Sequence, residues 1–299
     1  MKVLVVMSTY NGAKTIQKQI DSIYNQKGVS LGLFVRDDGS TDETLKILYR
    51  NAEIYPNLSI VRGKNVGWEK SFMLALKKAP EADYYAFSDQ DDIWMENKLK
   101  SGIDALKSHN GNNPLLFHCN KFSVREDLKP LSHQVRRTAE PLNHQNAMIQ
   151  EFAQGCSVIM NNKARVLVTS YLPKKKIAHD FWCGLLCYLF GEVIYDDKKY
   201  FYHISYGSNA SGEGHMLKSW ICRFKKLLKE KEAYYSPCQD LLNGFSDKLS
   251  TEDECFCRRV LNYKYNLIDK LYLLFSLKFV RDSLLGTLSL KVAILFNKL

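Results

Sequence analysis

Short apolar runs alternate along the first part of the chain with longer segments in which apolar residues recur every three or four positions. The short runs are typical of buried parallel strands, and the longer segments are typical of amphipathic helices. The predicted strands are Lys2–Met7, Leu31–Arg36, Leu58–Arg62 and Tyr84–Ser88, and the predicted helices are Thr15–Asn25, a segment capped by Thr41, and Trp68–Lys78. This order predicts an α/β fold with a mostly parallel sheet and helices on both faces.

The pattern is less regular after residue 100. Further short apolar stretches predict strands at Leu115–Phe122, Gly155–Asn161, Val193–Tyr195 and Tyr200–Ile204. An apolar segment, Phe181–Phe190, predicts a helix, and the charged stretch 124–147 predicts a mobile loop. A run of small and polar residues at 207–214 then predicts a boundary, so that residues 1–212 form one domain and residues 213–299 a helical extension.

The extension is the basic part of the chain. From Met216 to Leu299 there are 15 Lys and Arg against 9 Asp and Glu, within a net charge of +10 for the whole chain. Helical patterns run over Leu217–Lys231, Leu261–Phe275 and Lys278–Phe296, and none has the roughly 18 to 20 uncharged apolar residues of a membrane span. Two interpretations stay open: amphipathic helices on an anionic membrane surface, or a hairpin packed on the first domain.

Nucleic acid is not an expected partner, because the aromatic residues of the extension lie among leucines at helical spacing rather than beside clustered basic residues. The apolar run at the amino terminus is too short for a signal peptide, so we expect a cytoplasmic protein. In that setting the eight scattered cysteines are expected to be buried thiols rather than disulfides.

Candidate chemistry gathers where the predicted strands end. Three of them run into polar clusters, Ser8–Asn11, Asp37–Ser40 and Asp89–Asp92, and the carboxyl ends of parallel strands meet in one crevice where ligands bind. Ionising carboxylates as close as Asp89 and Asp91 together costs free energy unless a cation lies among them, and Mn²⁺ or Mg²⁺ suits such oxygen ligands. Asp92 has a simpler interpretation, as a cap for a helix over Trp94–Leu106.

These motifs resemble a known family. The sequences Ser-Thr-Tyr-Asn-Gly from Ser8, Val-Arg-Asp-Asp-Gly-Ser-Thr-Asp from Val35 and Phe-Ser-Asp-Gln-Asp-Asp-Ile-Trp from Phe87 are similar to those of inverting family-2 glycosyltransferases of GT-A fold, in their bacterial rhamnosyltransferase-like branch. The resemblance covers roughly residues 1–212. It implies a GT-A, Rossmann-like catalytic domain there, followed by the basic helical extension.

The resemblance also implies roles for single residues. The expected contacts to the nucleotide sugar are Ser8, Tyr10, Asp37, Asp38, Lys70 and Asp89. Asp91, together with Asp89, is the expected ligand of Mn²⁺ or Mg²⁺. His179-Asp180-Phe181-Trp182 resembles the family motif that carries the general base, which implies Asp180 in that role. The acceptor side is expected at Gly155, Cys156 and Trp182.

One position departs from the family pattern. Where relatives have a histidine before a glycine that helps to hold the metal or diphosphate, this chain has Tyr206 before Gly207. Three alternatives follow: Tyr206 substitutes by hydrogen bonding, His203 turns in to replace the family histidine, or fewer ligands surround the metal.

The implied reaction is a single displacement with inversion. The expected donor is dTDP-rhamnose or a UDP-hexose, and the expected acceptor is a glycan or lipid-linked saccharide at the inner face of the cell membrane, as in synthesis of capsule or other cell-surface polysaccharide. The alternative is a non-catalytic partner of another transferase that binds sugar nucleotide or glycan, which the tyrosine at 206 favours.

Overall fold

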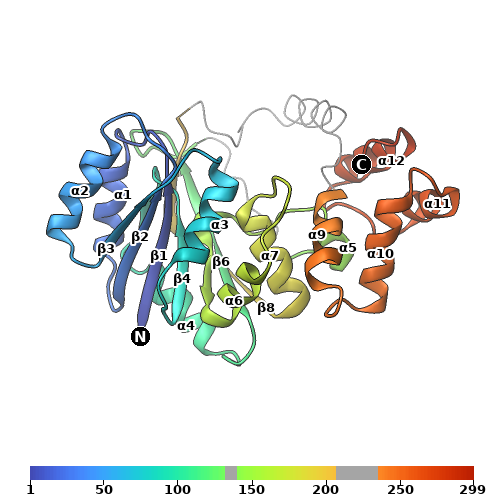
Figure 1. The fold of residues 1–299 in the computed structure, drawn as a ribbon, viewed down its shortest axis with the longest axis horizontal. Coiled ribbons are helices and arrows are strands. Elements are labelled where there is room, and N and C mark those ends of the chain that lie inside the picture. The colour runs from blue at the N-terminus through green and yellow to red at the C-terminus, as the bar shows by residue number, and fades with distance from the viewer. Residues whose placement is uncertain (132–139, 207–234) are drawn as a thin grey trace. The chain divides into compact units, whose positions relative to one another are not determined.

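The computed structural model describes residues 1–131, 140–206 and 235–299 (Figure 1). Contacts divide the chain into two compact units, which are treated separately below. Unit 1 comprises residues 1–139, 153–172 and 178–206, and unit 2 comprises residues 140–152, 173–177 and 207–299. The predicted boundary at 207–214 lies outside the described residues, as does the predicted helix Leu217–Lys231.

Unit 1 is built on an eight-stranded sheet in the order β3-β2-β1-β4-β7-β6-β8-β5. Its strands are β1 Lys2–Thr9, β2 Ser30–Asp37, β3 Leu58–Arg62, β4 Tyr84–Ser88, β5 Ile93–Trp94, β6 Leu115–Val124, β7 Ile159–Asn161 and β8 Glu192–Ile204. Strands β1 to β4 are parallel to one another, β6 is parallel to β8, and β7 and β5 run antiparallel to their neighbours. The predicted mostly parallel α/β fold is confirmed.

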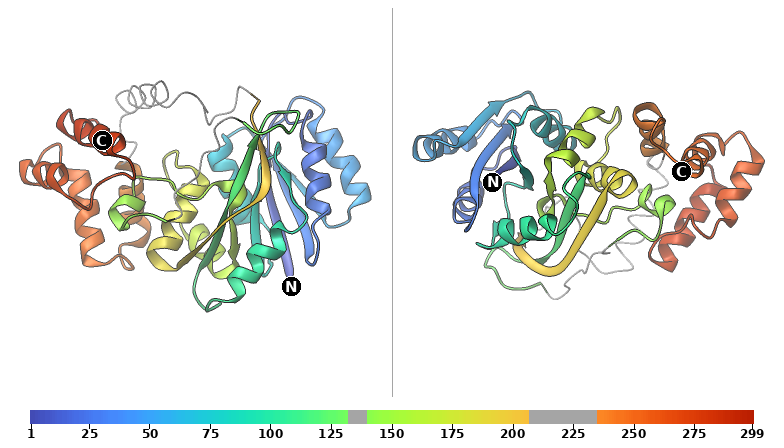
Figure 2. Two further views of the ribbon diagram at one scale, coloured as in Figure 1. Left: turned by 180° about the vertical axis from the view of Figure 1, so that it is seen from behind. Right: turned by 90° about the horizontal axis from the view of Figure 1, so that it is seen from below.

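Helices cover both faces of this sheet. They are α1 Ile16–Tyr24, α2 Thr44–Ile54, α3 Trp68–Lys78, α4 Lys98–Lys107, α6 Asn162–Ser170 and α7 His179–Phe190, with a short 3-10 turn at Gly155–Ser157. Helices α3, α6 and α7 lie in front of the sheet in Figure 1, and α1, α2 and α4 lie on the opposite face, which Figure 2 shows from behind. With both faces covered, β1 is buried from Val3 to Thr9, as its run of apolar residues predicts.

The strand register aligns the polar strand ends. Thr9 of β1 pairs with Asp37 of β2, which pairs in turn with Arg62 of β3. On the other side of β1, Met7 pairs with Ser88, the last residue of β4. The residues after β4 therefore emerge beside the end of β1, so that the three polar clusters meet at one edge of the sheet.

Some predicted elements of unit 1 are wrong in their bounds. The predicted strand Gly155–Asn161 is shorter, because Gly155–Ser157 forms a 3-10 turn and β7 begins at Ile159. The predicted helix Trp94–Leu106 begins only at Lys98, because Ile93 and Trp94 form β5 and pair with β8. The two strands predicted within 193–204 are one continuous strand, β8, whose charged middle residues interrupt the apolar pattern without interrupting the pairing with β6.

Unit 2 is helical. Its described helices are α5 His144–Ala147, α9 Tyr235–Phe245, α10 Thr251–Asn262, α11 Leu267–Phe275 and α12 Leu284–Leu295. The predicted helix Leu261–Phe275 is wrong, because the side chain of Asn266 accepts the N–H groups of Ile268 and Asp269 and starts a new helix. Ser283 caps α12 in the same way, so the predicted helix from Lys278 begins later.

No helix in the described ranges combines the length and the apolar character that a membrane span requires. The described cysteines form no disulfide, and all of them except Cys255 are buried, as expected for structural thiols.

Candidate active site

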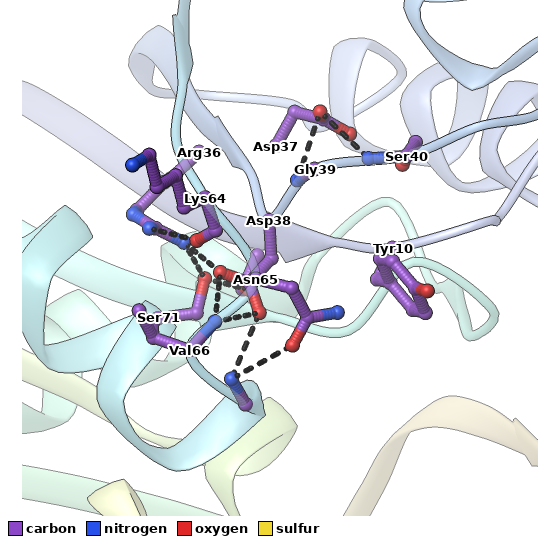
Figure 3. A network of polar contacts seen from close by, with 12 residues as sticks. Tyr10, Arg36, Asp37, Asp38, Gly39, Ser40, Lys64, Asn65, Val66 and Ser71 are labelled. Atoms are coloured by element: carbon purple, nitrogen blue, oxygen red, sulfur yellow. Dashed lines mark hydrogen bonds and ion pairs between the residues drawn. The ribbon is translucent and has the colours of Figure 1, made fainter.

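A buried ion pair organises the β2 side of the strand ends (Figure 3). Arg36 at the end of β2 donates from Nη1 to Asp38 Oδ1 at 2.5 Å and to Ser71 Oγ at 2.6 Å. The backbone N–H groups of Val66 and Gly67 donate to the same carboxylate at 3.0–3.1 Å. Both members of the pair are almost fully buried, and the additional hydrogen bonds are what such a pair needs to offset the loss of hydration.

Asp37 shapes the adjacent turn. Its Oδ1 accepts the N–H groups of Gly39 at 3.2 Å and Ser40 at 3.0 Å. Gly39 has a φ of +87°, and a Cβ there would lie 3.2 Å from the backbone nitrogen of Asn65, so the turn requires glycine. Asp37 is fully buried, and its Oδ2 has no hydrogen-bond partner among the described residues. This oxygen is thus an unused acceptor beside the strand ends.

The remaining candidates on this side differ in exposure. Ser8 is buried, with its Oγ 2.5 Å from Ser71 Oγ, so it belongs to the Arg36 network. Tyr10 is 46% exposed, which leaves its ring open to a planar ligand, and it stands to one side of the network in Figure 3. Lys70 is an exposed residue in the first turn of α3.

Gln90 connects the loop after β4, which carries Asp89, Asp91 and Asp92, to the end of β1 by hydrogen bonds. Its Oε1 accepts from Thr9 Oγ1 at 2.5 Å and from the N–H of Tyr10 at 2.9 Å, and its Nε2 donates to the carbonyl of Tyr10 at 3.2 Å. The middle residue of the Asp-Gln-Asp motif therefore fixes the two flanking aspartates relative to the polar end of β1.

Four carboxylates gather beyond β4 in an acidic cluster, which we define as Asp89, Asp91, Asp92 and Asp180. Burial, followed by the charges of the other three, raises the pKa of Asp89 well above its ordinary value, against a hydrogen bond from the Cys156 thiol. Burial and the charge of Asp92 raise the pKa of Asp91 to about 6, and His203 opposes that rise. The cluster is therefore electrostatically unfavourable without a cation.

Asp92 and His203 form a buried pair within this cluster. His203 Nδ1 lies 2.9 Å from Asp92 Oδ1, and the antiparallel pairing of Ile93 with Tyr202 brings the two residues together. Asp92 is 1% exposed, and its Oδ2 has no hydrogen-bond partner among the described residues. Its interpretation as the cap of α4 is wrong, because Asn97 precedes that helix.

Potential metal ligands other than the two motif aspartates also converge here. One ligand atom each from Asp92, Cys156 and His203 lie within 4.8 Å of one another. Tyr206 is close as well: its pKa is raised to about 12 by burial and then by the charges of Asp91, Glu126 and Asp92. Both candidates for the missing family histidine therefore lie at the acidic cluster.

Asp180 lies in the first turn of α7, two residues after Ala178, which precedes the helix. Its Oδ2 accepts the N–H of Gly155 at 2.8 Å, and its Oδ1 accepts its neighbour Phe181's N–H at 2.9 Å. A Cβ at Gly155 would lie 2.5 Å from His179 Nε2, so the close approach of this backbone to α7 requires glycine. The predicted base and the predicted acceptor-side residue Gly155 are therefore in direct contact.

The other two predicted acceptor-side residues differ. Cys156 is buried and contacts the acidic cluster through its thiol, as described above. Trp182 is fully buried, so its ring presents no surface to an acceptor in this conformation. His179, next to the base, stacks on Phe72 with ring centroids 4.0 Å apart and meets Phe87 edge-on at 4.7 Å, which anchors the start of α7 against α3 and β4.

Sequence reasoning missed Arg36 and Ser71. Arg36 is the one charged residue before the final aspartate of an otherwise apolar buried strand, and a buried charge requires a partner. Asp38, two residues on, faces the same side. That spacing is the signal from which the pair was predictable.

A model of the family described as "Glycosyl transferase family 2" matches residues 4–164, which is more than half of the chain. The chain belongs to glycosyl transferase family 2. The predicted membership is thus confirmed, and the matched region contains the Arg36 network, three of the four carboxylates of the acidic cluster, and Gly155.

Two curated relatives of this family-2 glycosyltransferase are named for their reactions. The dTDP-rhamnosyl transferase RfbG of Shigella flexneri is 41% identical over 111 residues, 36% of this chain and 38% of that protein. The UDP-Glc:alpha-D-GlcNAc-diphosphoundecaprenol beta-1,3-glucosyltransferase WfgD of Escherichia coli is 33% identical over 109 residues, 36% of this chain and 42% of that protein. The matched segments thus span less than half the length of these relatives.

Solved structures of low identity share the fold of this family-2 chain. The Staphylococcus aureus TarS 1–349 structure in complex with UDP-GlcNAc has a TM-score of 0.57 at 20% identity, covering 93% of this chain and 78% of that one. A mannosyltransferase of Pyrobaculum calidifontis, in complex with GDP-Man and Mn²⁺, has a TM-score of 0.53 at 16% identity, covering 99% of this chain and 88% of that one. The predicted GT-A fold is confirmed.

Proposed function

We propose that this family-2 chain transfers a sugar from a nucleoside-diphosphate donor to a hydroxyl group of a glycan or lipid-linked saccharide, with inversion at the anomeric carbon. The observation that carries the proposal is the acidic cluster. Four carboxylates meet at the edge of the sheet. Burial and then their mutual repulsion raise the pKa of Asp89 and Asp91, and the backbone N–H groups of Gly155 and Phe181 donate to Asp180. Such a site suits a cation with its diphosphate on one side and a base on the other.

The residues present fit a divalent cation, Mn²⁺ or Mg²⁺. Asp92 keeps a buried oxygen without a hydrogen-bond partner among the described residues, and burial together with the charge of Asp92 raises the pKa of Asp91, a penalty that a bound cation would relieve. We assign Asp91 and Asp89 as carboxylate ligands. Bound there, the cation would neutralise the diphosphate as it leaves.

We further propose that His203, rather than Tyr206, replaces the family histidine. Metal-ligating histidines typically donate one ring N–H to a carboxylate, which orients the ring so that the other nitrogen binds the metal. His203 has such a partner in the buried Asp92 carboxylate, at 2.9 Å. Tyr206, whose pKa is raised to about 12, keeps its proton at neutral pH and suits a hydrogen bond to the diphosphate instead.

Asp180 is the proposed general base. Its carboxylate takes the proton from the acceptor hydroxyl as the hydroxyl oxygen bonds to the anomeric carbon. The bond from that carbon to the diphosphate oxygen breaks, and its electron pair leaves with the nucleoside diphosphate. The two backbone N–H groups that donate to Asp180 and its place in the first turn of α7 stabilise the carboxylate form that this role requires.

On the donor side, we propose Tyr10 as the stacking surface for the base. Asp37 is fully buried in this conformation, and we propose that its Oδ2 accepts an N–H group of the base once the adjacent turn opens. Asp38 is already engaged by Arg36 and two backbone N–H groups, so its role is to shape the site. Ser8 lies in the same network, and exposed Lys70 is the candidate for contact with the diphosphate.

The names of the relatives support the choice of substrates. One is named for dTDP-rhamnose, and another for a UDP-glucose donor with a lipid diphosphate-linked acceptor. We therefore propose dTDP-rhamnose or a UDP-hexose as donor, and a reaction in cell-surface polysaccharide synthesis at the inner face of the cell membrane.

A donor screen tests this function. Purified protein is incubated with dTDP-rhamnose, UDP-glucose, UDP-galactose and UDP-N-acetylhexosamines, with Mn²⁺ or Mg²⁺ and then with chelator, and release of nucleoside diphosphate is measured with simple glycan acceptors. We expect metal-dependent release from one donor in the natural chain and in Asp104→Asn, whose carboxylate pairs with Lys100 on the surface of α4. Asp180→Asn should bind that donor and release almost nothing.

The rival function is a non-catalytic partner of another transferase. It predicts donor binding without turnover in every variant. Donor-dependent transfer that disappears in Asp180→Asn would exclude it, whereas binding of a donor with no transfer to any acceptor would favour it over the proposal.

The proposed metal ligand His203 can be tested separately from sugar transfer. Pulsed electron paramagnetic resonance of bound Mn²⁺ detects directly coordinated imidazole nitrogen, and we expect that signal in the natural chain and in His109→Gln, a surface histidine after α4. Loss of the signal in His203→Gln with retained Mn²⁺ would support His203 as a ligand. An unchanged signal, or none in the natural chain, would contradict that assignment.

A further inference from the structure

Large apolar side chains are exposed on the last two helices of unit 2. Tyr265 and Leu277 are each 91% exposed, Leu284 is 87% exposed and Phe275 is 78% exposed. Further exposed apolar residues of the same two helices and the residues flanking them are Leu267, Ile268, Leu271, Leu285, Leu288, Leu295 and Phe296. Together these eleven residues define what we call the outer apolar face. Concentrations of this kind on a soluble surface mark interaction sites.

The exposed residues follow the helical repeat. On α11, Leu267, Leu271 and Phe275 are spaced by four and share one side, whereas Leu273 points the other way and is fully buried. Helix α11 therefore has two apolar sides, of which only one is used for packing within the described residues.

Helix α12 is organised in the same manner. Leu284 and Leu288 are exposed one turn apart, with Leu295 on the same side two turns further on. Leu290 and Ala293 are buried on the opposite side. A helix that is apolar all round belongs in an apolar environment on both sides, and the described part of the chain supplies that environment on one side only.

Two lysines hold α11 and α12 side by side. Lys291 of α12 donates from Nζ to the carbonyl oxygens of Leu273 at 2.7 Å and Ser276 at 3.0 Å. Lys270 of α11 donates to the carbonyl oxygen of Leu295 at 2.9 Å and to Asn297 Oδ1 at 3.0 Å. Each ammonium therefore satisfies carbonyl oxygens at the carboxyl end of the other helix and holds the two helices together.

Charge indicates what covers the outer apolar face. Between Tyr263 and Leu299 there are six basic residues, Lys264, Lys270, Lys278, Arg281, Lys291 and Lys298, against Asp269 and Asp282. A second copy of this chain would bring the same positive charge to the contact, whereas anionic lipid headgroups bring the opposite charge. Exposed Tyr265 is of the aromatic type that is enriched at membrane interfaces, and exposed Phe275 and Phe296 suit the apolar face of an interfacial helix.

We propose that α11 and α12 lie in the plane of an anionic lipid surface, with the outer apolar face among the acyl chains just below the headgroups and with Lys264 and Lys298 at headgroup level. Neither helix is long enough to cross a bilayer, so this is an interfacial contact. The contact needs no sugar donor and no cation, and it therefore stands or falls independently of the proposed transfer reaction.

The test is sedimentation of the full chain with vesicles, without donor or metal. We expect binding to vesicles of phosphatidylcholine with added phosphatidylglycerol, and weak binding to phosphatidylcholine alone. The triple variant Leu271→Ser, Phe275→Ser, Leu277→Ser should bind the anionic vesicles at least about tenfold more weakly. It replaces three exposed apolar side chains that the lipid would bury in the proposed contact. The matched control is Tyr49→Ser with Ile54→Ser, which removes exposed apolar residues from α2 of unit 1 and should bind as before.

A second variant separates charge from folding. Lys264→Gln with Lys298→Gln leaves every helix residue in place and should reduce the preference for phosphatidylglycerol, with the far-ultraviolet circular dichroism of all variants unchanged. Equal, undiminished vesicle binding by the triple variant would overturn the proposal, as would absence of binding by the natural chain. A dimeric mass by light scattering that the triple variant reduces to a monomeric one would instead assign the face to a second copy.

Discussion

Two acidic regions lie along the same edge of the sheet in unit 1. They differ in whether the surrounding protein groups neutralise their carboxylates. In the Arg36 network, the Asp38 carboxylate is paired with a guanidinium and two backbone N–H groups. In the acidic cluster, Asp89, Asp91 and Asp92 lie close to one another and to Asp180. Among the described groups, the Cys156 thiol, the His203 imidazole and, for Asp92, the buried Lys98 ammonium oppose their charge. The first region is complete in the protein alone, whereas the second has an excess of negative charge.

The contrast distinguishes the structural scaffold from the proposed reaction site. A buried carboxylate with matched donors holds loops together, here the segment after β3 and the end of β2. A buried carboxylate with like neighbours lowers stability and is retained where ligand chemistry requires it. In the sequence both regions are strings of aspartates at the end of a strand, and the motif predicts a cation only for the second. The pairing of Asp38 with Arg36, which makes the first region a scaffold, is seen only in the structure.

The largest expected effect is on turnover. Asp180→Asn should lower kcat by roughly 10² to 10⁴, the range for loss of a general base, with little change in donor affinity. The comparison assigns catalysis to the acidic cluster, so Asp38→Asn should retain a higher kcat than Asp180→Asn wherever both fold. Single-turnover kinetics measures the chemical step, and equal kcat values for Asp180→Asn and the natural chain would remove Asp180 from the mechanism.

The next largest effect is the loss of unfolding free energy when the Arg36 network is disrupted. Asp38→Ala should lower the free energy of unfolding by about 3 to 5 kcal/mol, because it leaves a buried guanidinium without its partner. Urea unfolding measures the change. Asp104→Ala, which breaks the exposed pair with Lys100, is the control and should change stability by less than about 1 kcal/mol. Similar small changes in both variants would mean that the Arg36 pair contributes nothing to the scaffold.

Removing a carboxylate from the acidic cluster should change the free energy of unfolding in the opposite direction. Without metal at pH 7.5, Asp91→Asn should raise the free energy of unfolding by roughly 1 to 3 kcal/mol, since it removes a charge whose pKa is raised to about 6 by burial and Asp92. The same variant should lose most of the rise in melting temperature that Mn²⁺ gives to the natural chain. Destabilisation by Asp91→Asn in metal-free protein would place Asp91 with the scaffold.

The smallest expected effect is the pH dependence of the difference in unfolding free energy between Asp91→Asn and the natural chain. The folded-state pKa of Asp91, about 6, lies above its ordinary value of 3.8, so the folded protein takes up the proton first as pH falls. The penalty in the natural chain is therefore complete above pH 6 and is relieved as pH falls from about 6 to about 4. The stability difference between Asp91→Asn and the natural chain should shrink over that range in metal-free urea titrations, and a constant difference would contradict the raised pKa.

Most of the fold was predictable from the sequence because local patterns determine it. The apolar run Lys2–Met7 and the helix Trp68–Lys78 correspond to β1 and α3. Errors arose where a side chain overrides the pattern: Asn266 interrupts a continuous apolar repeat by capping α11, and Trp94 pairs across the sheet although its neighbours favour a helix. Caps and long-range pairing depend on partners that periodicity does not reveal.

The candidate site was predictable in its composition and less so in its contacts. The motifs indicated Asp89, Asp91 and Asp180 as candidate site residues, and these three lie in one cluster in the structure. The pairing of Asp92 with His203, separated by 111 positions, depends on the register of β5 with β8. The burial of Trp182 likewise depends on how α7 packs, which the sequence motif around Asp180 does not specify.

The irregular pairing of β6 with β8 bears on which insertions this family-2 chain tolerates. Cys119 pairs with Asp196 and Phe122 with Tyr202, so β8 carries three more residues than β6 over this stretch. Bulges of this kind absorb the extra residues, so that the residues paired after them still share a face of the sheet. The pairing of Tyr202 with Phe122 and Ile93, and with it the position of His203 beside Asp92, depends on the length of this stretch. Chimeras joined there should therefore be matched in length before they are matched in sequence.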